Sequence, residues 1–223
     1  MSSALPLAVE VATHGETGGT AAALIPQEKS LQTLQEAAAA CRACPLWQTG
    51  TQTVFGEGRK TSRLVLVGEQ PGDMEDKEGR PFVGPAGRIL DRALTEAGID
   101  RATAYVTNVV KHFKWLASGR RRLHQKPNAR EIGACLPWLD AEIEVLRPEV
   151  IVALGATAAQ ALFGKDVRVT RDHGRFLETR LAPHATVTGH PASILRATSE
   201  DDRHAAMEGF VADLRLVASA LRA

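Results

Sequence analysis

The sequence contains few cysteines, almost no excess of charge and no long hydrophobic run. Three cysteines in 223 residues argue against a disulfide framework and leave metal ligation, redox chemistry or simple burial. A net charge of +1 excludes the global basic excess of many nucleic-acid binders, although a local basic face can still bind phosphates. No apolar run approaches the ~20 residues that span a bilayer, so we expect no membrane association.

The N-terminus shows no charged region followed by an apolar run, so we expect no secretory signal and a cytoplasmic location. Residues 1–27 are rich in Ala, Gly, Ser and Thr without a sustained period, and we expect them to form a disordered arm. The remaining residues, 28–223, are enough for one hydrophobic core, so we expect a single domain.

Four short apolar runs have the length and composition of buried strands. They occupy residues 64–67, 104–106, 150–154 and 185–188. Apolar residues at helical spacing separate and follow these runs, over residues 86–97, 132–146, 156–163 and 207–221, with a short helix expected at 31–41. Strands that alternate with helices predict an α/β fold, a three-layer α/β/α sandwich around a central four-stranded parallel sheet.

Polar residues follow three of the predicted strands. Glu69 and Gln70 follow the first strand, Asn108 follows the second, and His190 follows the fourth. Ligands of parallel sheets bind beyond the carboxyl ends of the strands. We therefore expect a carboxylate, an amide and an imidazole to share one cleft.

Each of these residues also has a simpler interpretation. The segment from Gly68 to Asp73 could be a plain strand-to-helix turn, since it has neither a GxGxxG nor a Walker pattern. Phe82 could pack in the core or offer its ring to a flipped base. His190 could donate to a ligand or merely pack, with Ser193 as a helix cap.

The cysteines suggest a metal site. Cys41 and Cys44 have the spacing of a metal chelate, Cys135 lies on a predicted helix, and His112 is the best candidate for a fourth ligand. Structural zinc fits three cysteines and a histidine, and an iron–sulfur cluster fits the same set. The spacing alone does not choose between zinc and iron.

A basic loop precedes the second long helix. It contains Arg120, Arg121, Arg122 and Lys126, which could be solvated or could contact phosphates. His124 is the one group in this loop that could be neutral and nucleophilic near pH 7.

Together these segments resemble the family-4 type of uracil-DNA glycosylase, from about residue 37 to residue 221. The resemblance rests on a Cys-x-x-Cys, a Gly-Glu-x-Pro-Gly, a Pro-Phe-Val-Gly-x-Ala-Gly, a Tyr-x-Thr-Asn and a His-Pro-x-x motif in this order. They stand at residues 41–44, 68–72, 81–87, 105–108 and 190–193.

Two departures resemble the UdgX class. His112 stands where the family usually places its third cluster cysteine, and the loop at residues 120–124 is inserted. The Gln-Pro-Gly-Asp form of the first motif, at residues 70–73, matches this class as well. The loop reads Arg-Arg-Arg-Leu-His where Lys-Arg-Arg-Ile-His is usual, and the late motif reads Gly-His-Pro-Ala-Ser where Val-His-Pro-Ser-Ser is usual.

The resemblance implies a monomeric DNA repair protein that excises uracil from DNA, preferably single-stranded, and stays linked to C1′ of the abasic sugar. The implied catalytic residues are His124 as nucleophile, Glu69 beside the sugar cation and His190 as donor to uracil O2. The implied substrate-binding residues are Gln70, Gly72, Asp73, Phe82, Asn108 and Ser193. Phosphates would bind Arg120, Arg121, Arg122 and Lys126. A [4Fe-4S] cluster, or structural zinc, would bind Cys41, Cys44, His112 and Cys135.

Three other functions fit parts of the sequence. The first is an ordinary family-4 enzyme that releases uracil and leaves an abasic site, and His124 distinguishes it from the UdgX class. The second is a non-catalytic nucleic-acid-binding module with structural zinc, which the polar residues at the strand ends disfavour. The third is a nucleotide hydrolase, which the missing phosphate-loop pattern disfavours.

Overall fold

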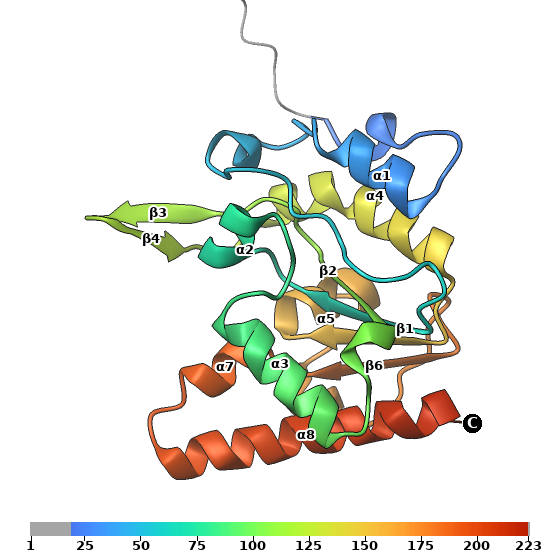
Figure 1. Ribbon diagram of the computed structural model, residues 1–223, viewed down its shortest axis with the longest axis vertical. Helices are drawn as coiled ribbons and strands as arrows, with labels where there is room; N and C mark the ends of the chain where they lie inside the picture. The colour runs from blue at the N-terminus through green and yellow to red at the C-terminus, as the bar shows by residue number, and fades with distance from the viewer. Residues whose placement is uncertain (1–18, 223) are drawn as a thin grey trace, which may run out of the picture.

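The computed structural model describes residues 19–222 and contains the predicted four-stranded parallel sheet (Figure 1). The strand order is β2-β1-β5-β6. The strands are β1 (Leu64–Gly68), β2 (Ala104–Asn108), β5 (Val150–Leu154) and β6 (His184–Thr188). All four predicted strands are confirmed, with bounds that differ by at most two residues at either end.

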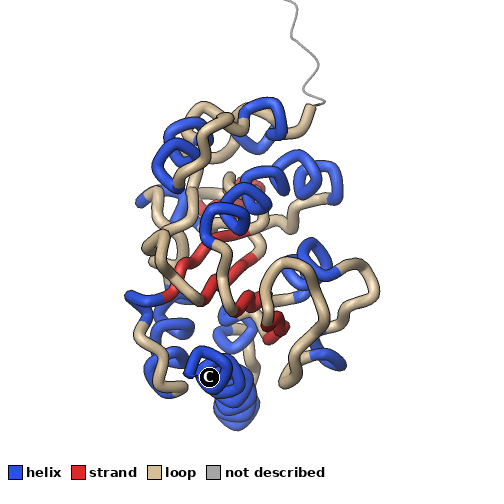
Figure 2. The backbone as a smooth tube through the Cα atoms, turned by 90° about the vertical axis from the view of Figure 1, so that its right-hand side faces the viewer, coloured by secondary structure: helices blue, strands red, loops and turns tan. Residues whose placement is uncertain are grey.

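Helices cover both faces of the sheet, as Figure 2 shows for the strands between two helical layers. Alternate strand residues pack on opposite sides, so that Val65 and Val67 belong to one core cluster while Leu64 and Leu66 belong to the other. The first cluster lies under α1 (Leu31–Ala38), α4 (Ala129–Leu146) and α5 (Ala156–Phe163). The second lies under α3 (Pro85–Glu96), α7 (Pro191–Leu195) and α8 (Glu200–Arg222). The three-layer α/β/α prediction is therefore confirmed.

Local signals explain where the long helices begin and end. Pro85 is the first residue of α3, where its missing N–H costs nothing. Asn128 and Glu131 form a capping box at the start of α4, and Gly164 follows the last residue of α5. The sequence analysis did not predict the short helices α2 (Asp73–Glu78) and α6 (Val169–Asp172), or the 3-10 turns at Pro45–Gln48 and Arg101–Thr103.

A β-hairpin stands where the sequence analysis expected only a basic loop. Strands β3 (Trp115–Ser118) and β4 (Arg121–His124) pair in antiparallel fashion and project from the body beside α2 (Figure 1). Gly119 has a φ of +58°, which suits the first position of a tight two-residue hairpin turn. A hairpin fixes the direction of His124 more firmly than a loop would.

The predicted N-terminal arm extended too far along the chain. Residues Ala21–Leu24 form a 3-10 helix, η1, which packs against α4, and Ala21 is fully buried. Burial of this apolar turn on α4 makes it part of the folded body. The rest of the predicted arm, residues 1–18, lies outside the described residues.

After the two central strands, β1 and β5, the chain passes to opposite faces of the sheet. The helix α3, which follows β1, covers one face of the sheet, whereas α5, which follows β5, covers the other. This reversal opens a crevice at the carboxyl ends of neighbouring strands, where ligands of doubly wound sheets bind. Over residues 19–222, no helix combines the length and the hydropathy that a bilayer crossing requires.

Candidate active site

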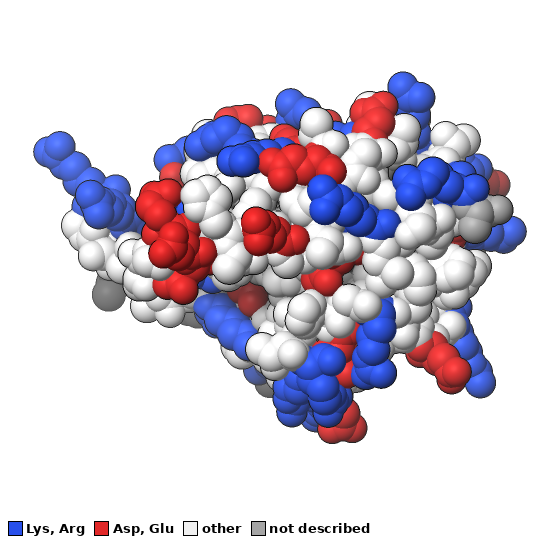
Figure 3. Space-filling view, turned by 90° about the horizontal axis from the view of Figure 1, so that it is seen from below, with Lys and Arg blue, Asp and Glu red and all other residues white. Residues whose placement is uncertain are grey.

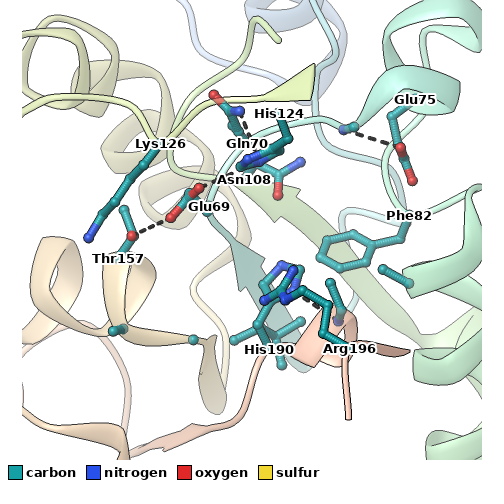
Figure 4. Close-up of a pocket in the computed structure, with 16 residues that line it drawn as sticks. Glu69, Gln70, Glu75, Phe82, Asn108, His124, Lys126, Thr157, His190 and Arg196 are labelled. Atoms are coloured by element: carbon teal, nitrogen blue, oxygen red, sulfur yellow. Dashed lines mark hydrogen bonds and ion pairs between the residues drawn. The ribbon is translucent and has the colours of Figure 1, made fainter. Parts of the chain in front are cut away.

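A cavity of about 570 Å³ lies at this crevice, a volume in the usual range for small-ligand pockets (Figure 4). Eight of the predicted site residues line it. They are Glu69, Gln70, Gly72, Phe82, Asn108, His124, Lys126 and His190. Residues from four motifs and from the basic loop therefore meet in one place. The strand-end argument predicts this for Glu69, Gln70, Asn108 and His190.

The cavity has a tight inner wall formed by Phe82 and Asn108. A side chain at Gly68 would place its Cβ only 2.4 Å from Asn108 Oδ1 and 2.7 Å from Phe82 Cζ, so only glycine fits there. Phe82 has a φ of +56°, which is rare for a residue other than glycine and typical of functional sites. Both side chains are buried, and a planar ring could lie against Phe82 while Asn108 contacts its polar edge.

Glu75 joins the two glycine-containing segments that build this wall. Its carboxylate accepts hydrogen bonds from the backbone N–H of Gly72 at 3.1 Å and of Gly84 at 2.8 Å. The segment that carries Phe82 is thereby attached to the turn after β1. Glu75 is buried and lines the cavity.

His190 faces the cavity with one ring nitrogen. Its Nδ1 lies 3.1 Å from the backbone N–H of Ala192 and accepts a hydrogen bond from it, so the neutral ring carries its proton on Nε2. Burial lowers the pKa of His190 to about 4, and the nearby Arg196 cation acts in the same direction. At neutral pH His190 is therefore a neutral N–H donor, and its ring stacks at 6.3 Å from that of Phe82.

Glu69 connects the opposite wall to His124. One carboxylate oxygen accepts a short hydrogen bond from the hydroxyl of Thr157, in the first turn of α5. The other oxygen, Oε1, lies 3.6 Å from His124 Nε2. The carboxylate thus stands between α5 and the hairpin, where it can stabilise a cation in the cavity.

Gln70 determines which nitrogen of His124 carries the proton. Its Oε1 accepts from the backbone N–H of Lys114, and its Nε2 donates to the carbonyls of Lys114 and Gln125, so the amide orientation is fixed. The same Nε2 lies 2.9 Å from His124 Nε2, so its two hydrogens are shared among three acceptors; His124 Nε2 is the acceptor in this contact because an amide nitrogen only donates. Partial burial lowers the pKa of His124, so the ring is neutral and the Nε2 lone pair is the one that accepts from Gln70.

Arg122 was predicted to bind DNA phosphates, but in the structure it pairs with carboxylates of the protein. Its guanidinium pairs with Asp73 at 2.5 Å and with Asp76 at 2.6 Å, and it lies over the rings of Phe113 and Trp115. These carboxylates neutralise the cation and hold β4 against α2. Asp73, predicted to shape the pocket, does not line it, because its carboxylate binds Lys77 and Arg122.

Ser193, Arg120 and Arg121 also lie outside the cavity. The Ser193 hydroxyl donates to the carbonyl of His190 at 2.7 Å, which makes it a local turn residue. Arg120 and Arg121 lie at the exposed end of the hairpin, away from the cavity lining. Lys126 does line the cavity and is exposed.

Three lining residues with charged or hydroxyl side chains were missed by the sequence analysis: Glu75, Thr157 and Arg196. Thr157 comes three residues after the end of the third predicted strand, so the strand-end argument could have found it. Glu75 lies in the unpredicted helix α2, and no sequence signal singled out Arg196. Arg196 is exposed at the cavity mouth near both histidines, whose pKa values it lowers.

The predicted metal ligands are all buried, but they do not form a complete site. Cys41, Cys44 and Cys135 are free thiols in one core cluster, and burial raises the pKa of Cys135 to about 12. His112 Nε2 instead lies 3.0 Å from the hydroxyl of Thr53. Over residues 19–222, no group of three or more His, Cys, Asp or Glu side chains is arranged to hold a metal ion. The three thiols suit a soft metal centre, whereas His112 does not join them in this arrangement.

The fold and the site define a class of protein: an α/β/α sandwich with a polar, ligand-sized cavity at its switch point. Residues 55–215 match the model of the uracil DNA glycosylase superfamily. A type-4 uracil-DNA glycosylase of Thermotoga maritima is 40% identical over 183 residues, which cover 82% of this chain and 92% of that protein. A type-4 uracil-DNA glycosylase of Archaeoglobus fulgidus is 35% identical over 174 residues, 75% of this chain and 84% of that protein.

A type-5 uracil-DNA glycosylase of Thermus thermophilus is 32% identical over 161 residues, 61% of this chain and 71% of that protein. The chain belongs to the uracil DNA glycosylase superfamily, and the two type-4 relatives named above match more of it than this type-5 relative does.

Proposed function

We propose that this protein excises uracil from DNA and is then captured covalently by the abasic sugar through His124. The excision part is supported by the type-4 uracil-DNA glycosylases that the chain resembles along most of its length. The capture part rests on one observation: His124 places its Nε2, which accepts from the Gln70 amide, at the cavity mouth and 3.6 Å from Glu69 Oε1.

Uracil must leave the base stack to enter the cavity, which costs a few kcal/mol in a duplex and less in a single strand. This cost favours single-stranded DNA as the substrate. In the cavity the base would stack on Phe82, and the Asn108 amide would hydrogen-bond to its Watson–Crick edge. Lys126 and Arg196, both exposed at the mouth, would contact the flanking phosphates.

In the first step the bond between C1′ and uracil N1 breaks, and its electron pair leaves with the base. The N–H at Nε2 of His190 donates to uracil O2 as negative charge develops there, an interaction that is stronger in the transition state than in the ground state. The sugar becomes an oxocarbenium ion, which the Glu69 carboxylate stabilises as in other glycosidic cleavages.

In the second step the hydrogen bond from Gln70 to His124 Nε2 is broken, and the released Nε2 lone pair forms a bond to C1′ while the ring proton stays on Nδ1. The imidazole gains the positive charge that the sugar loses, so the product is a ring alkylated on nitrogen beside the Glu69 carboxylate. A held nucleophile can compete with water because its effective concentration is very high. The electron pairs and charges of the two steps balance without an oxidant or a further reactant.

The alternative is an ordinary glycosylase in which water attacks C1′ and His124 only contacts DNA. To separate the two, a single-stranded oligonucleotide with one uracil is mixed with the protein, boiled in detergent and run on a denaturing gel. Capture predicts a band at the summed mass, absent for His124→Ala, which still releases uracil. A wild-type sample that yields only alkali-labile abasic DNA contradicts capture, and an adduct formed by His124→Ala contradicts the assignment of the nucleophile.

We also propose that the three buried thiols bind a [4Fe-4S] cluster, with His112 as the fourth ligand after local rearrangement. The burial and proximity of these free cysteines support the proposal. The cluster would stiffen the region between the N-terminal segment and α4. Metal analysis of the purified protein tests it: about four iron atoms with broad visible absorbance are expected, whereas one zinc ion in a colourless protein contradicts it.

A further inference from the structure

The turn between β5 and α5 lies between two of the catalytic groups, and no step of the proposed reaction uses it. In the strand order β2-β1-β5-β6, the strand β5 stands between β1 and β6. Glu69 comes directly after β1, and His190 comes two residues after β6. The turn after β5 is therefore bordered by Glu69 on one side and His190 on the other, and residues 155–157 line the cavity there.

Gly155 brings this turn against His190. It has a φ of +90°, and a Cβ at this position would lie only 2.9 Å from His190 Cβ. The Gly155 N–H donates to the carbonyl of Thr188, the last residue of β6, at 2.9 Å. The segment that carries His190 is thereby held close to the start of α5.

Thr157 connects the same turn to Glu69. Its hydroxyl donates to Glu69 Oε2, as the dashed line in Figure 4 shows, and the Thr157 side chain is buried. A hydroxyl has one hydrogen to donate, so it holds one carboxylate oxygen and leaves the other. The other oxygen, Oε1, is the one that lies 3.6 Å from His124 Nε2. Thr157 therefore selects which oxygen of Glu69 is turned toward the nucleophile.

The helix itself does not require a threonine at this position. The sequence of α5 is Ala-Thr-Ala-Ala-Gln-Ala-Leu-Phe, in which Thr157 is the one hydroxyl residue, and alanine has the higher helix propensity. A threonine inside a helix commonly donates to the carbonyl three or four residues earlier. For Thr157 those positions, residues 153 and 154, belong to β5. The hydroxyl is instead given to Glu69.

The charge of the surface cannot replace a well-placed carboxylate. The net charge is +1, and basic and acidic side chains both occur across the face shown in Figure 3. Exposed charges are screened over about 8 Å at physiological salt. A carboxylate in the cavity wall acts at short range, where its attraction for a cation is strongest. The orientation of Glu69 thus controls how well the site stabilises a cationic sugar.

We propose that Thr157 is a positioning residue, which holds the Glu69 carboxylate in the orientation that stabilises the oxocarbenium ion. Thr157 acts through Glu69 and exchanges no proton with the substrate. This inference rests on the proposed function, because the cation in question forms when uracil leaves.

The test compares variants that differ in one hydroxyl. Thr157→Val removes the hydroxyl and keeps the shape, whereas Thr157→Ser keeps the hydroxyl. Thr95→Val is the control, since Thr95 is exposed on α3 and donates to the carbonyl of Asp91 in the same helix. Single-turnover uracil release is measured for each variant with Glu69 present and with Glu69→Ala. Affinities are measured for single-stranded DNA that carries a cationic aza-sugar or a neutral tetrahydrofuran in place of the uridine.

Thr157→Val should lower the rate of uracil release about tenfold, because a hydrogen bond to a charged group is lost, and Thr157→Ser should recover most of it. Its preference for the cationic over the neutral sugar should fall by about the same factor. In the Glu69→Ala background Thr157→Val should change nothing further, and Thr95→Val should equal the wild type.

Two outcomes overturn the positioning role: Thr157→Val keeps the rate and the preference of the wild type, or it loses as much without Glu69 as with it. A wild type that binds the cationic and the neutral sugar equally well also overturns it. If the wild type never releases uracil but shows a preference for the cationic sugar that Thr157→Val loses, the proposed function fails while the positioning role stands.

Discussion

At the scale of single residues, the chemistry depends on the protonation of His124. Burial lowers the pKa of this imidazole below its ordinary value of 6.5, so the neutral nucleophile predominates at pH 7. Protonation removes the Nε2 lone pair. Because the folded-state pKa is depressed, the neutral form should be kept from pH 8 down to about 6.5 and lost only at lower pH.

The ratio of covalent adduct to free abasic DNA should therefore stay constant between pH 8 and pH 6.5, the ordinary value for the group, and fall only at lower pH. His190 remains a neutral donor over most of this range, since its pKa is about 4. The measurement is a set of single-turnover reactions quenched and resolved on denaturing gels. A ratio that already falls between pH 8 and pH 7, or that never falls, contradicts a neutral histidine nucleophile.

A second residue-scale prediction concerns Gly68, where a side chain would displace Asn108 and Phe82. Gly68→Ala places a Cβ within 3 Å of both neighbours, so the walls of the base pocket must shift. We expect kcat/KM for uracil excision to fall about 100-fold, because a shift near 1 Å in positioning groups costs that much. The control is Gly98→Ala, where a Cβ meets no heavy atom within 4 Å, although its φ of +77° makes some loss of stability expected. Equal activity of Gly68→Ala and the wild type would contradict the assigned pocket.

At the scale of elements, the hairpin acts as a carrier for His124, and Arg122 fixes it to α2. Removing this guanidinium takes away the cation paired with Asp76, leaves Asp73 paired with Lys77 alone, and frees β4 to move. We predict that Arg122→Ala lowers the ratio of adduct to free abasic DNA about tenfold while uracil is still excised. The matched control is Arg121→Ala, an exposed neighbour whose loss should weaken DNA binding at low salt and leave that ratio unchanged. If both variants change the ratio alike, Arg122 acts by charge alone.

At the scale of the whole molecule, a buried ion pair ties the sheet to α4. Lys111 Nζ lies 2.5 Å from Glu142 Oε2, with side chains 1% and 0% exposed, and Glu142 also accepts from Tyr105 and Thr107. Glu142→Gln should cost about 3–5 kcal/mol of unfolding free energy, because it leaves the Lys111 cation buried without a counter-charge. Adding Lys111→Met should recover part of this loss, which urea denaturation can measure. A double variant as unstable as Glu142→Gln would mean that the charge is not what destabilises the single variant.

An exposed pair provides the reference for this comparison. Arg92 and Glu96 form an ion pair on the surface of α3, with side chains 67% and 40% exposed. Since solvent screens such pairs, Arg92→Met should change stability by less than about 1 kcal/mol. The contrast between the two pairs isolates the effect of burial.

The sequence predicted the sheet well because its strands are covered on both faces. Runs such as residues 64–67 and 150–154 are continuously apolar for that reason, and the ends of parallel strands must share one edge. Glu69, Asn108 and His190 could therefore be placed in one cleft without coordinates. The relatives confirm the superfamily, while capture by His124 and the metal site stay predictions.

The residues that were misplaced owe their positions to contacts between distant segments. Arg122 looks like its neighbours Arg120 and Arg121 in a basic run, and only its pairing with carboxylates 49 and 46 positions away distinguishes it. The hairpin was missed because most of its side chains are exposed, so no alternation of apolar and polar residues marks it. Glu75 can be recognised as a site residue only from the structure, where α2 places its carboxylate beside the backbone N–H of Gly84.

The measurement that most directly tests covalent capture is the number of uracil molecules released per protein molecule in the presence of excess uracil-containing single-stranded DNA. The account predicts that wild-type protein stops after one uracil per chain, because each molecule stays bonded to C1′ through His124. It predicts that His124→Ala continues to release uracil well beyond one equivalent. Wild-type protein that turns over many times, with no DNA retained after denaturation, would contradict the account and leave an ordinary uracil-DNA glycosylase.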